Sequence, residues 1–122
     1  MPKTILVADD SPFVRKMLCK IFEAEEDYDL CAEAVNGQEA IDLAKRHRPD
    51  LIILDFSMPV MNGVDAAHEL KRIMPHIPII LFTLHADTLG AQLMGGNSPF
   101  DLVVSKTDAV NIVKHVRSLI PV

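Results

Sequence analysis

Two short apolar runs of the chain each end in acidic residues. Residues 5–8 (Ile-Leu-Val-Ala) run directly into Asp9 and Asp10, and residues 51–54 (Leu-Ile-Ile-Leu) run directly into Asp55. Both runs are short, continuous and rich in branched side chains, which is typical of strands buried on both faces of a parallel sheet. We therefore expect the three carboxylates at the carboxyl ends of strands, where open α/β sheets bind their ligands.

The size and charge of the chain limit its class. Its 122 residues, 49% of them hydrophobic, suffice for one compact domain over 1–122 and are too few for two of ordinary size. The net charge of −5 argues against direct binding of nucleic acid, which needs basic residues gathered on one face. The first apolar run is too short for a signal peptide or a membrane span, so we expect a cytoplasmic protein without membrane contact. Cys19 and Cys31 form no C-x-x-C pair and are expected to be small buried side chains in a reducing compartment.

Strands and helices are expected to alternate along the whole chain. The expected strands cover residues 5–8, 30–35, 51–54, 79–82 and 102–104. Helical apolar stripes occur at residues 11–25, 40–44, 64–73 and 110–120, and Asn36-Gly37 indicates a turn. Between residues 85 and 99, Gly90, Gly95, Gly96 and Pro99 predict a short or mobile fourth helix. This alternation predicts an α/β fold: a doubly wound, five-stranded parallel sheet with helices on both faces.

Five residues with reactive or charged side chains fall at the expected strand ends: Asp9, Asp10, Asp55, Thr83 and Lys106. They can therefore converge on one crevice. Three neighbouring carboxylates repel one another unless a cation is present, and Mg²⁺ prefers oxygen ligands of this kind. The lysine can bind a phosphoryl oxygen as a point charge, and the threonine hydroxyl can donate a hydrogen bond to one. A carboxylate in this setting is suited to form an aspartyl phosphate.

These residues, together with their neighbours, carry a family resemblance. The first expected strand is followed by Asp9-Asp10-Ser11-Pro12, and the third by Asp55, after which come Met58-Pro59 and Gly63. Thr83 follows the fourth expected strand and Lys106 the fifth, so the order is the same as in the family. In this respect the chain resembles the receiver domain of bacterial two-component response regulators over essentially its whole length. Any one of these residues alone would be weak support, but the ordered set is specific.

The resemblance implies a flavodoxin-like sheet with strand order 2-1-3-4-5 and a set of roles. Asp55 would be the phosphoacceptor, and Thr83 and Lys106 would bind the phosphoryl group. The metal would be Mg²⁺, held directly by Asp10, largely through water by Asp9, and also by Asp55 and the backbone carbonyl of Ser57. The donor would be a phosphohistidine on a histidine kinase or phosphotransfer protein, and phosphorylation would switch binding to a downstream output protein or domain. Such a chain catalyses only its own phosphorylation and dephosphorylation.

The sequence departs from the family at four places. Val103 stands where receivers usually carry an aromatic residue whose rotation reports phosphorylation. Leu84 replaces a residue that is commonly small and could narrow access to the phosphoacceptor, Thr107 replaces a frequent proline, and residues 95–100 are rich in glycine. His85, two residues beyond the threonine, could position or exclude the attacking water.

Each site residue also has an ordinary structural interpretation when taken alone. Asp9 and Asp10 could cap a helix, Asp55 could sit in a turn, Thr83 suits a strand, and Lys106 could be a surface charge. Their joint placement favours the functional interpretation.

Two alternatives from other classes remain open at this point. One is an interaction module with the same fold that is not phosphorylated, for which Val103 and Leu84 are the motivation. The other is a Mg²⁺-dependent aspartyl-phosphate phosphatase, which would need a second acid near the nucleophile, where the chain has Phe56 and Ser57. The sequence leaves open the cognate kinase, the output partner, homodimer formation, and whether the chain acts alone or within a longer regulator.

Overall fold

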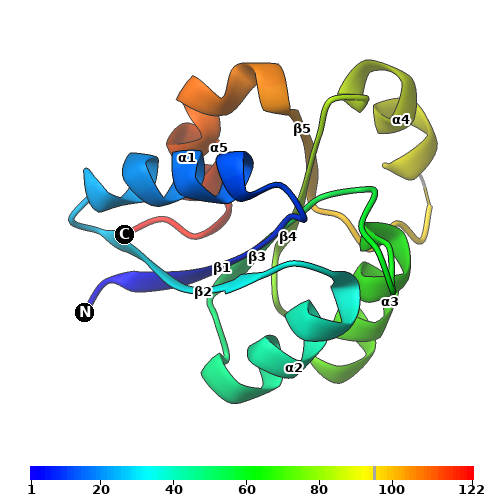
Figure 1. Cartoon of the computed structure of the whole chain (residues 1–122), viewed down its shortest axis with the longest axis horizontal. Helices are drawn as coiled ribbons and strands as arrows, with labels where there is room; N and C mark the ends of the chain where they lie inside the picture. The colour runs from blue at the N-terminus through cyan, green and yellow to red at the C-terminus, as the bar shows by residue number, and fades with distance from the viewer. Residues whose placement is uncertain (95) are drawn as a thin grey trace.

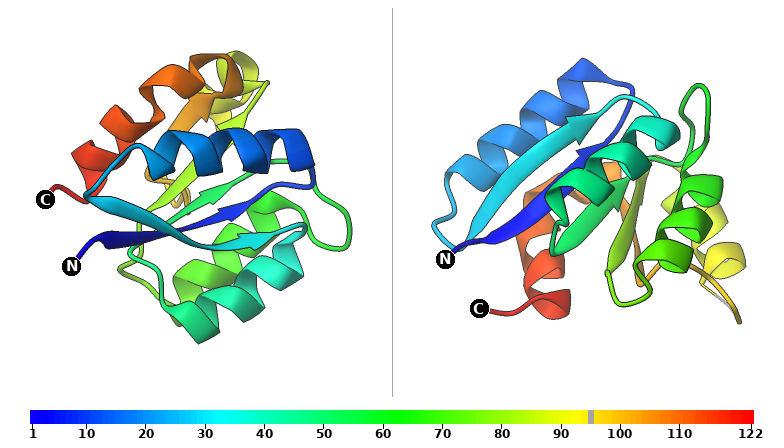
Figure 2. Two further views of the ribbon diagram at one scale, coloured as in Figure 1. Left: turned by 60° about the vertical axis from the view of Figure 1, so that its left-hand side comes forward. Right: turned by 90° about the horizontal axis from the view of Figure 1, so that it is seen from below.

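The computed structural model describes residues 1–94 and 96–122 and contains a five-stranded sheet with helices on both faces (Figures 1 and 2). All neighbouring strands are parallel, and their order is β2-β1-β3-β4-β5. The strands are β1 (Lys3–Ala8), β2 (Tyr28–Ala34), β3 (Leu51–Leu54), β4 (Ile79–Thr83) and β5 (Leu102–Ser105). The expected fold class and strand order are therefore confirmed.

Within the described residues, five α-helices and one 3₁₀ helix connect or follow the strands. They are α1 (Pro12–Glu23), α2 (Gly37–His47), α3 (Gly63–Ile73), α4 (Ala86–Leu93), the 3₁₀ helix η1 (Lys106–Asn111) and α5 (Ile112–Leu119). Side-chain oxygens cap the first three: Ser11 Oγ accepts from the Val14 N–H, and Asn36 and Asn62 do the same for α2 and α3. Such caps satisfy backbone donors that have no partner inside the helix.

The core has two halves because successive strand residues point to opposite faces of the sheet. Ile5 and Val7 of β1 pack in the half covered by α1 and α5, whereas Leu6 and Ala8 pack in the half covered by α2 and α3. The four residues of β3 are all buried, which explains why this strand is apolar throughout. Burial of each large aliphatic side chain contributes about 1.5–3 kcal/mol, so both faces hold the sheet in place.

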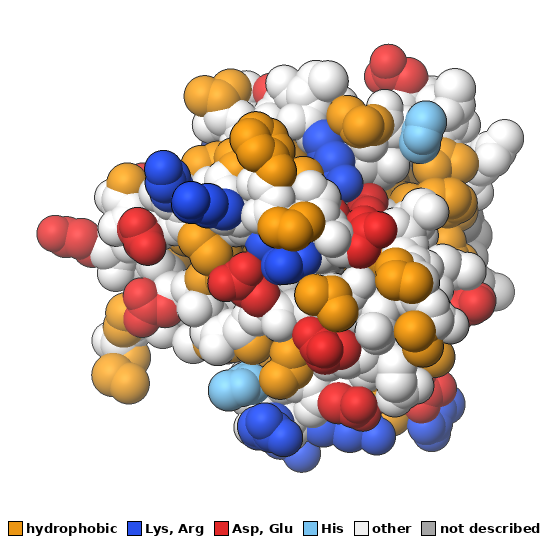
Figure 3. All heavy atoms as spheres, viewed as in Figure 1, with side chains coloured by type: hydrophobic (Ala, Val, Ile, Leu, Met, Phe, Trp, Pro, Cys, Tyr) orange, Lys and Arg blue, Asp and Glu red, His pale blue; other side chains and the backbone are white. Residues whose placement is uncertain are grey.

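Basic side chains gather at the lower edge of the face seen in Figure 3, below α2 and α3. The last turn of α2 contains Lys45, Arg46 and His47, and the last turn of α3 contains Lys71 and Arg72. Cations at the carboxyl end of a helix complement its dipole, so this group has a structural explanation.

Two expected boundaries near β2 were wrong. The strand begins at Tyr28 rather than Leu30, because the Tyr28 ring is buried and its hydroxyl donates to the Ile120 carbonyl at 2.9 Å. Asn36 and Gly37 do not form a separate turn, since Asn36 caps α2 and Gly37 is its first residue.

The last helical segment also differs from the expected continuous helix. It starts as the 3₁₀ helix η1, which has non-helical dihedrals at Asp108, and only then becomes α5. Val110 was expected on the apolar stripe, but it lies within η1 and is 84% exposed. The buried side of this segment is formed instead by Ala109, Ile112, Val116 and Ile120.

The fourth helix is short, as expected, with eight residues in α4. Gly95, one of the residues behind that expectation, lies outside the described residues, and mobility of this region stays a prediction. Cys19 and Cys31 are free thiols in the described structure, but both are partly exposed rather than buried. No helix in the described part of the chain combines the length and apolar character needed to cross a membrane.

Candidate functional site

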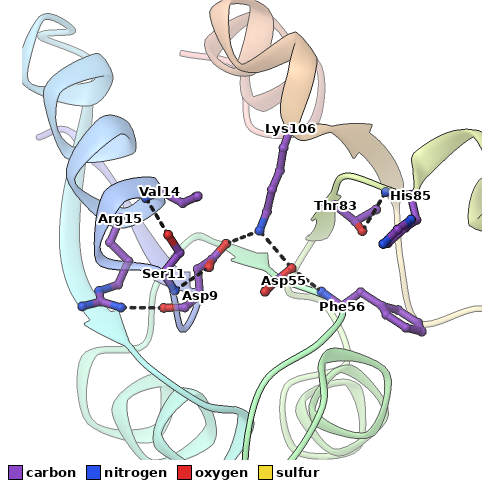
Figure 4. A network of polar contacts seen from close by, with 9 residues as sticks. All are labelled: Asp9, Ser11, Val14, Arg15, Asp55, Phe56, Thr83, His85 and Lys106. Carbon is purple, nitrogen blue, oxygen red and sulfur yellow. Dashed lines mark hydrogen bonds and ion pairs between the residues drawn. The ribbon is translucent and has the colours of Figure 1, made fainter.

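The carboxyl ends of four strands bring the predicted site residues together (Figure 4). Asp9 directly follows β1, Asp55 directly follows β3, Thr83 is the last residue of β4, and Lys106 directly follows β5. Carboxylate oxygens of Asp9, Asp10 and Asp55 lie within 4.8 Å of one another. Parallel strands that end at one edge of the sheet thus create a concentrated anionic cluster.

Lys106 bridges the two buried acids of this cluster. Its Nζ lies 2.8 Å from Asp9 Oδ2 and 3.1 Å from Asp55 Oδ1. The side chains of Asp9 and Asp55 are only 2% and 9% exposed, so the pair would be strongly repulsive without the ammonium. Asp10, by contrast, is exposed at the rim.

Burial and charge act in opposite directions on the ionisation of this group. Burial, followed by the negative charge of Asp9, raises the pKa of Asp55, and Lys106 counteracts only part of that rise. Burial would lower the pKa of Lys106, but its contacts with Asp9 and Asp55 outweigh burial and raise it. The lysine therefore stays charged. A cation bound beside Asp55 would further stabilise the ionised form of its carboxylate.

Asp9 is held through nearly all of its polar atoms. Its N–H donates to the Ala34 carbonyl at 3.0 Å, and its Oδ1 accepts from the Ser11 N–H at 2.9 Å. Its carbonyl accepts from Arg15 Nη1 at 2.7 Å. Oδ2 is buried and accepts no well-directed hydrogen bond within the described structure, although Lys106 Nζ lies close to it.

Arg15 was not among the predicted site residues, yet its guanidinium supports Asp9 from α1. A signal was nevertheless present, because Arg15 lies near the amino end of a helix, where a cation opposes the helix dipole. No acidic residue compensates within the first turn of α1.

The loop after Asp55 has a strained turn that is fixed at its far end. The Met61 N–H donates to the Pro59 carbonyl at 2.7 Å, and Val60 between them has φ 68°. This is a γ-turn with positive φ at a β-branched residue, a rare and costly conformation. The Met61 carbonyl in turn accepts from the Gly37 N–H at 2.9 Å. The loop that carries Ser57 is therefore held by α2.

A cavity of 180 Å³ lies beside Asp55. It is lined by Asp55, Phe56, Ser57, Thr83, Leu84, His85 and Lys106. In Figure 4 the threonine and His85 lie on the opposite side of Asp55 from Asp9. The threonine is buried, and its Oγ1 accepts a hydrogen bond from the His85 N–H at 3.2 Å. Leu84 is 66% exposed and stands at the mouth of this cavity.

The residues of the cluster fit a hard divalent cation. Mg²⁺ prefers carboxylate and carbonyl oxygens and keeps several water ligands, and the cluster offers three carboxylates with an exposed side at Asp10. The buried Asp9 Oδ2, without a well-directed donor, is a further sign that the site is built for positive charge. The structure thus combines a cation-binding cluster with a cavity beside one of its carboxylates.

Val103, the residue in the place of the usual aromatic side chain, is half-buried. It packs against the apolar cluster beneath α2 and α3. Valine has no ring and a stiff χ1 angle, so it cannot carry the rotation that an aromatic residue would.

Comparisons with known proteins match the chain to one family. A model described as the response regulator receiver domain covers residues 5–117. The chemotaxis protein CheY of Thermotoga maritima is 38% identical over 94 residues, which is 77% of this chain and 74% of that protein. The response regulator TrrA of Thermotoga maritima, solved in complex with Mg²⁺ and BeF, is 30% identical, with a TM-score of 0.80 over 97% of this chain and 99% of that one.

Other curated relatives are much longer proteins. A protein-glutamate methylesterase/protein-glutamine glutaminase of Hahella chejuensis is 40% identical over 83 residues, which is 68% of this chain but only 21% of that protein. The similarity therefore concerns one part of those relatives.

Proposed function

The chain belongs to the response regulator receiver domain family, and on this premise we propose that Asp55 is its phosphoacceptor. The single observation that carries the proposal is the position of Asp55 at the end of β3. There its carboxylate lies beside two further acids and 3.1 Å from Lys106 Nζ. No other carboxylate of this cluster both lines the adjoining cavity and contacts the lysine.

The proposed reaction is transfer of a phosphoryl group from a phosphohistidine. An Asp55 oxygen forms a bond to phosphorus while the bond from phosphorus to the imidazole nitrogen breaks, and the imidazole leaves and takes up a proton. Lys106 favours the ionised form of the Asp55 carboxylate before transfer and neutralises phosphoryl oxygens afterwards, and the Thr83 hydroxyl donates to one of them. Hydrolysis by water then returns the Asp55 carboxylate and releases phosphate.

The metal of this site is proposed to be Mg²⁺. Asp10 would bind it directly, Asp9 largely through water, and Asp55 and the backbone carbonyl of Ser57 would complete the protein ligands. When bound, the ion neutralises negative charge that develops on the transferred group. The oxygen ligands of the cluster and the Mg²⁺ named for the relative TrrA support this choice.

The proposed output is a change in partner binding. Phosphorylation adds a charge of about −1.5 to −2, which would draw Thr83 and Lys106 inward and shift an equilibrium of the region from β4 to α5. A histidine kinase or phosphotransfer protein would be the donor, and an output protein or domain the recipient of the signal. We further propose that residues 1–122 form one cytoplasmic receiver domain, whose only catalysis is on Asp55 itself.

A direct test is intact mass measurement after incubation with Mg²⁺ and acetyl phosphate. One phosphoryl adduct is expected on the wild-type chain and none on Asp55→Ala. Asp42→Ala, a change at an exposed residue of α2, serves as the matched control and should keep the adduct. No adduct on the wild-type chain would favour the interaction module that is not phosphorylated, and an adduct that persists on Asp55→Ala would place the acceptor elsewhere.

The aspartyl-phosphate phosphatase is the weaker alternative. Such an enzyme needs a second acid close after its nucleophile, and this chain has Phe56 and Ser57 there. The family match supports the receiver instead.

A further inference from the structure

Arg15 is the one residue of α1 whose side chain reaches back to the backbone beside the acidic cluster (Figure 4). Its Nη1 donates to the Asp9 carbonyl at 2.7 Å, while its Nε lies 3.4 Å from Glu33 Oε1 of β2. The arginine side chain is 17% exposed. It thus connects the loop after β1 to an edge strand of the sheet.

The ion pair alone does not explain why an arginine occupies this position. Partly exposed ion pairs contribute roughly 0–1 kcal/mol, and the Glu33 side chain is 43% exposed. In addition, a cation in the first turns of a helix is opposed by the helix dipole. The bond to the Asp9 carbonyl is therefore the contact that distinguishes Arg15 from an ordinary surface arginine.

That bond holds the peptide plane from which Asp10 extends. The peptide group between Asp9 and Asp10 is planar, so holding the Asp9 carbonyl also fixes the Asp10 N–H and the direction in which Asp10 leaves the peptide. The N–H of Asp9 is already bound to Ala34 of β2. With its carbonyl held by Arg15, both backbone polar groups of Asp9 are tied to β2, one directly and one through the guanidinium and Glu33.

We propose that Arg15, anchored by Glu33, is a positioning residue of the cation site: it fixes the peptide plane between Asp9 and Asp10 and so directs the Asp10 carboxylate toward the other two acids. This inference rests on the proposed function. Arg15 does not contact the cation or the phosphoryl group in this role. It acts by holding one ligand in place before a cation binds, which reduces the cost of ordering the site.

Glu33 is itself held on its second oxygen. The Cys19 thiol of α1 donates to Glu33 Oε2 at 3.3 Å. Burial and this hydrogen bond raise the pKa of Cys19 to about 11, so the thiol stays protonated and remains a donor at neutral pH. The two carboxylate oxygens of Glu33 thus contact two residues of α1, Oε1 facing Arg15 and Oε2 facing Cys19. These two contacts fix the orientation of Glu33 toward Arg15.

The experiment is a titration with MgCl₂ followed by ¹H–¹⁵N NMR on the amides of Asp10 and Ser11. Arg15→Met keeps the apolar stem of the side chain and removes the guanidinium. Loss of a residue that orients a metal ligand commonly costs 10–100-fold in affinity, so we expect the Kd for Mg²⁺ to rise by about tenfold. Without Mg²⁺, the Asp10 amide should also become more mobile, while the amides later in α1 stay unchanged.

The direction of the change in Kd for Mg²⁺ shows whether Arg15 acts by positioning Asp10 or only through its positive charge. Arg15 is a cation near three acids, so removing its charge without loss of positioning would tighten Mg²⁺ binding. Arg15→Lys keeps the charge, but one ammonium cannot replace the forked donors, and its Kd should lie between those of wild type and Arg15→Met. Arg117→Met is the matched control, because Arg117 pairs with Glu25 and Asp27 at the other end of the sheet and should leave the Kd unchanged.

The outcomes are distinguishable from failure of the proposed function. If wild type binds Mg²⁺ and Arg15→Met binds it equally or more tightly, Arg15 has no positioning role, although the proposed function stands. If wild type itself shows no saturable Mg²⁺ binding, both fail. Glu33→Gln tests the anchor without touching the helix, and an unchanged Kd there would show that Arg15 needs no support from β2.

Discussion

The ammonium nitrogen of Lys106 lies 3.1 Å from Oδ1 of Asp55, although 51 positions separate these residues in the chain. β3 and β5 are not neighbours in the sheet, since β4 lies between them, so the long lysine side chain spans the strand end of β4. This reach makes the charge of Asp55 dependent on a residue from a different part of the fold.

Lys106→Met should destabilise the chain in the absence of Mg²⁺. The change leaves Asp9 and Asp55 buried side by side without their cation, and removing one partner of a buried ion pair costs about 3–5 kcal/mol. Urea denaturation at pH 7 measures the loss, and saturating Mg²⁺ should recover part of it. Lys114→Met, at an exposed residue of α5, is the control and should stay within about 0.5 kcal/mol of wild type. Equal stabilities of the two variants would contradict the bridging role.

Asp55→Asn should stabilise the chain at neutral pH. Because the pKa of Asp55 is raised in the folded state, mainly by burial and then by Asp9, the folded chain binds a proton more readily than the unfolded chain. Wild-type stability therefore falls as pH rises from the unfolded pKa through the folded pKa, at about 1.4 kcal/mol for each unit of the shift. Asparagine lacks this cost, so the gain from the substitution should grow over that interval and then level off. Denaturation curves at several pH values without Mg²⁺ test this, and a pH-independent difference would refute it.

Leu84→Ala should accelerate phosphorylation of Asp55 by acetyl phosphate severalfold. Leu84 is 66% exposed at the mouth of the cavity, so its removal widens access and costs little burial. The free energy of unfolding should change by no more than about 0.5 kcal/mol. The initial rate of adduct formation, followed by intact mass, is the measurement. An unchanged rate would mean that the leucine does not narrow the entrance.

His85→Ala should change the rate at which phosphorylated Asp55 loses its phosphoryl group. The imidazole belongs to the cavity lining, and the His85 N–H is bound to Thr83 Oγ1, which keeps the residue beside the site. Slower loss would mean that His85 positions the attacking water, and faster loss that it excludes water. His68→Ala, at an exposed residue of α3, is the control. If both variants lose the group at the wild-type rate, the proposed role of His85 is wrong.

Two glycine substitutions should have opposite effects on stability. A Cβ on Gly63 would lie 2.0 Å from the Asp55 carbonyl oxygen, so Gly63→Ala forces backbone apart at the site and should cost about 1–3 kcal/mol. Gly90 lies within α4, and no described atom is within 4 Å of a Cβ there. Gly90→Ala should therefore stabilise the chain by up to about 1 kcal/mol. Thermal denaturation of both variants gives the comparison, and a neutral Gly63→Ala would show that the loop after Asp55 can yield.

Most of the fold could be predicted from local patterns because β1, β3, β4 and β5 contain short apolar runs with charged or hydroxyl residues at their ends. Residues 51–54 are all apolar, which indicates a strand covered on both faces. The strand β3 is buried in this way. The errors lie where local patterns conflict with distant contacts. Tyr28 joins β2 because of a bond to Ile120, and no local pattern contains that partner.

The candidate site was also predictable only in part. Residues at strand ends could be placed at one edge of the sheet from sequence, and the structure brings Asp9, Asp10, Asp55 and Lys106 together there. The support from Arg15 has only a weak signal in the sequence, a cation near the amino end of a helix, because the contact itself depends on a guanidinium that reaches back past the start of α1 to the Asp9 carbonyl. Contacts of that kind follow from three-dimensional packing and not from residue spacing.

The 3₁₀ helix η1, which begins at Lys106 and leads into α5, is less regular than the helix that follows it. Its hydrogen bonds are weaker than those of an α-helix, and its dihedrals break at Asp108 before Ile112 begins the regular helix. We therefore expect η1 to adjust first when the Lys106 side chain moves, while α5 keeps its buried contacts through Ile112 and Val116.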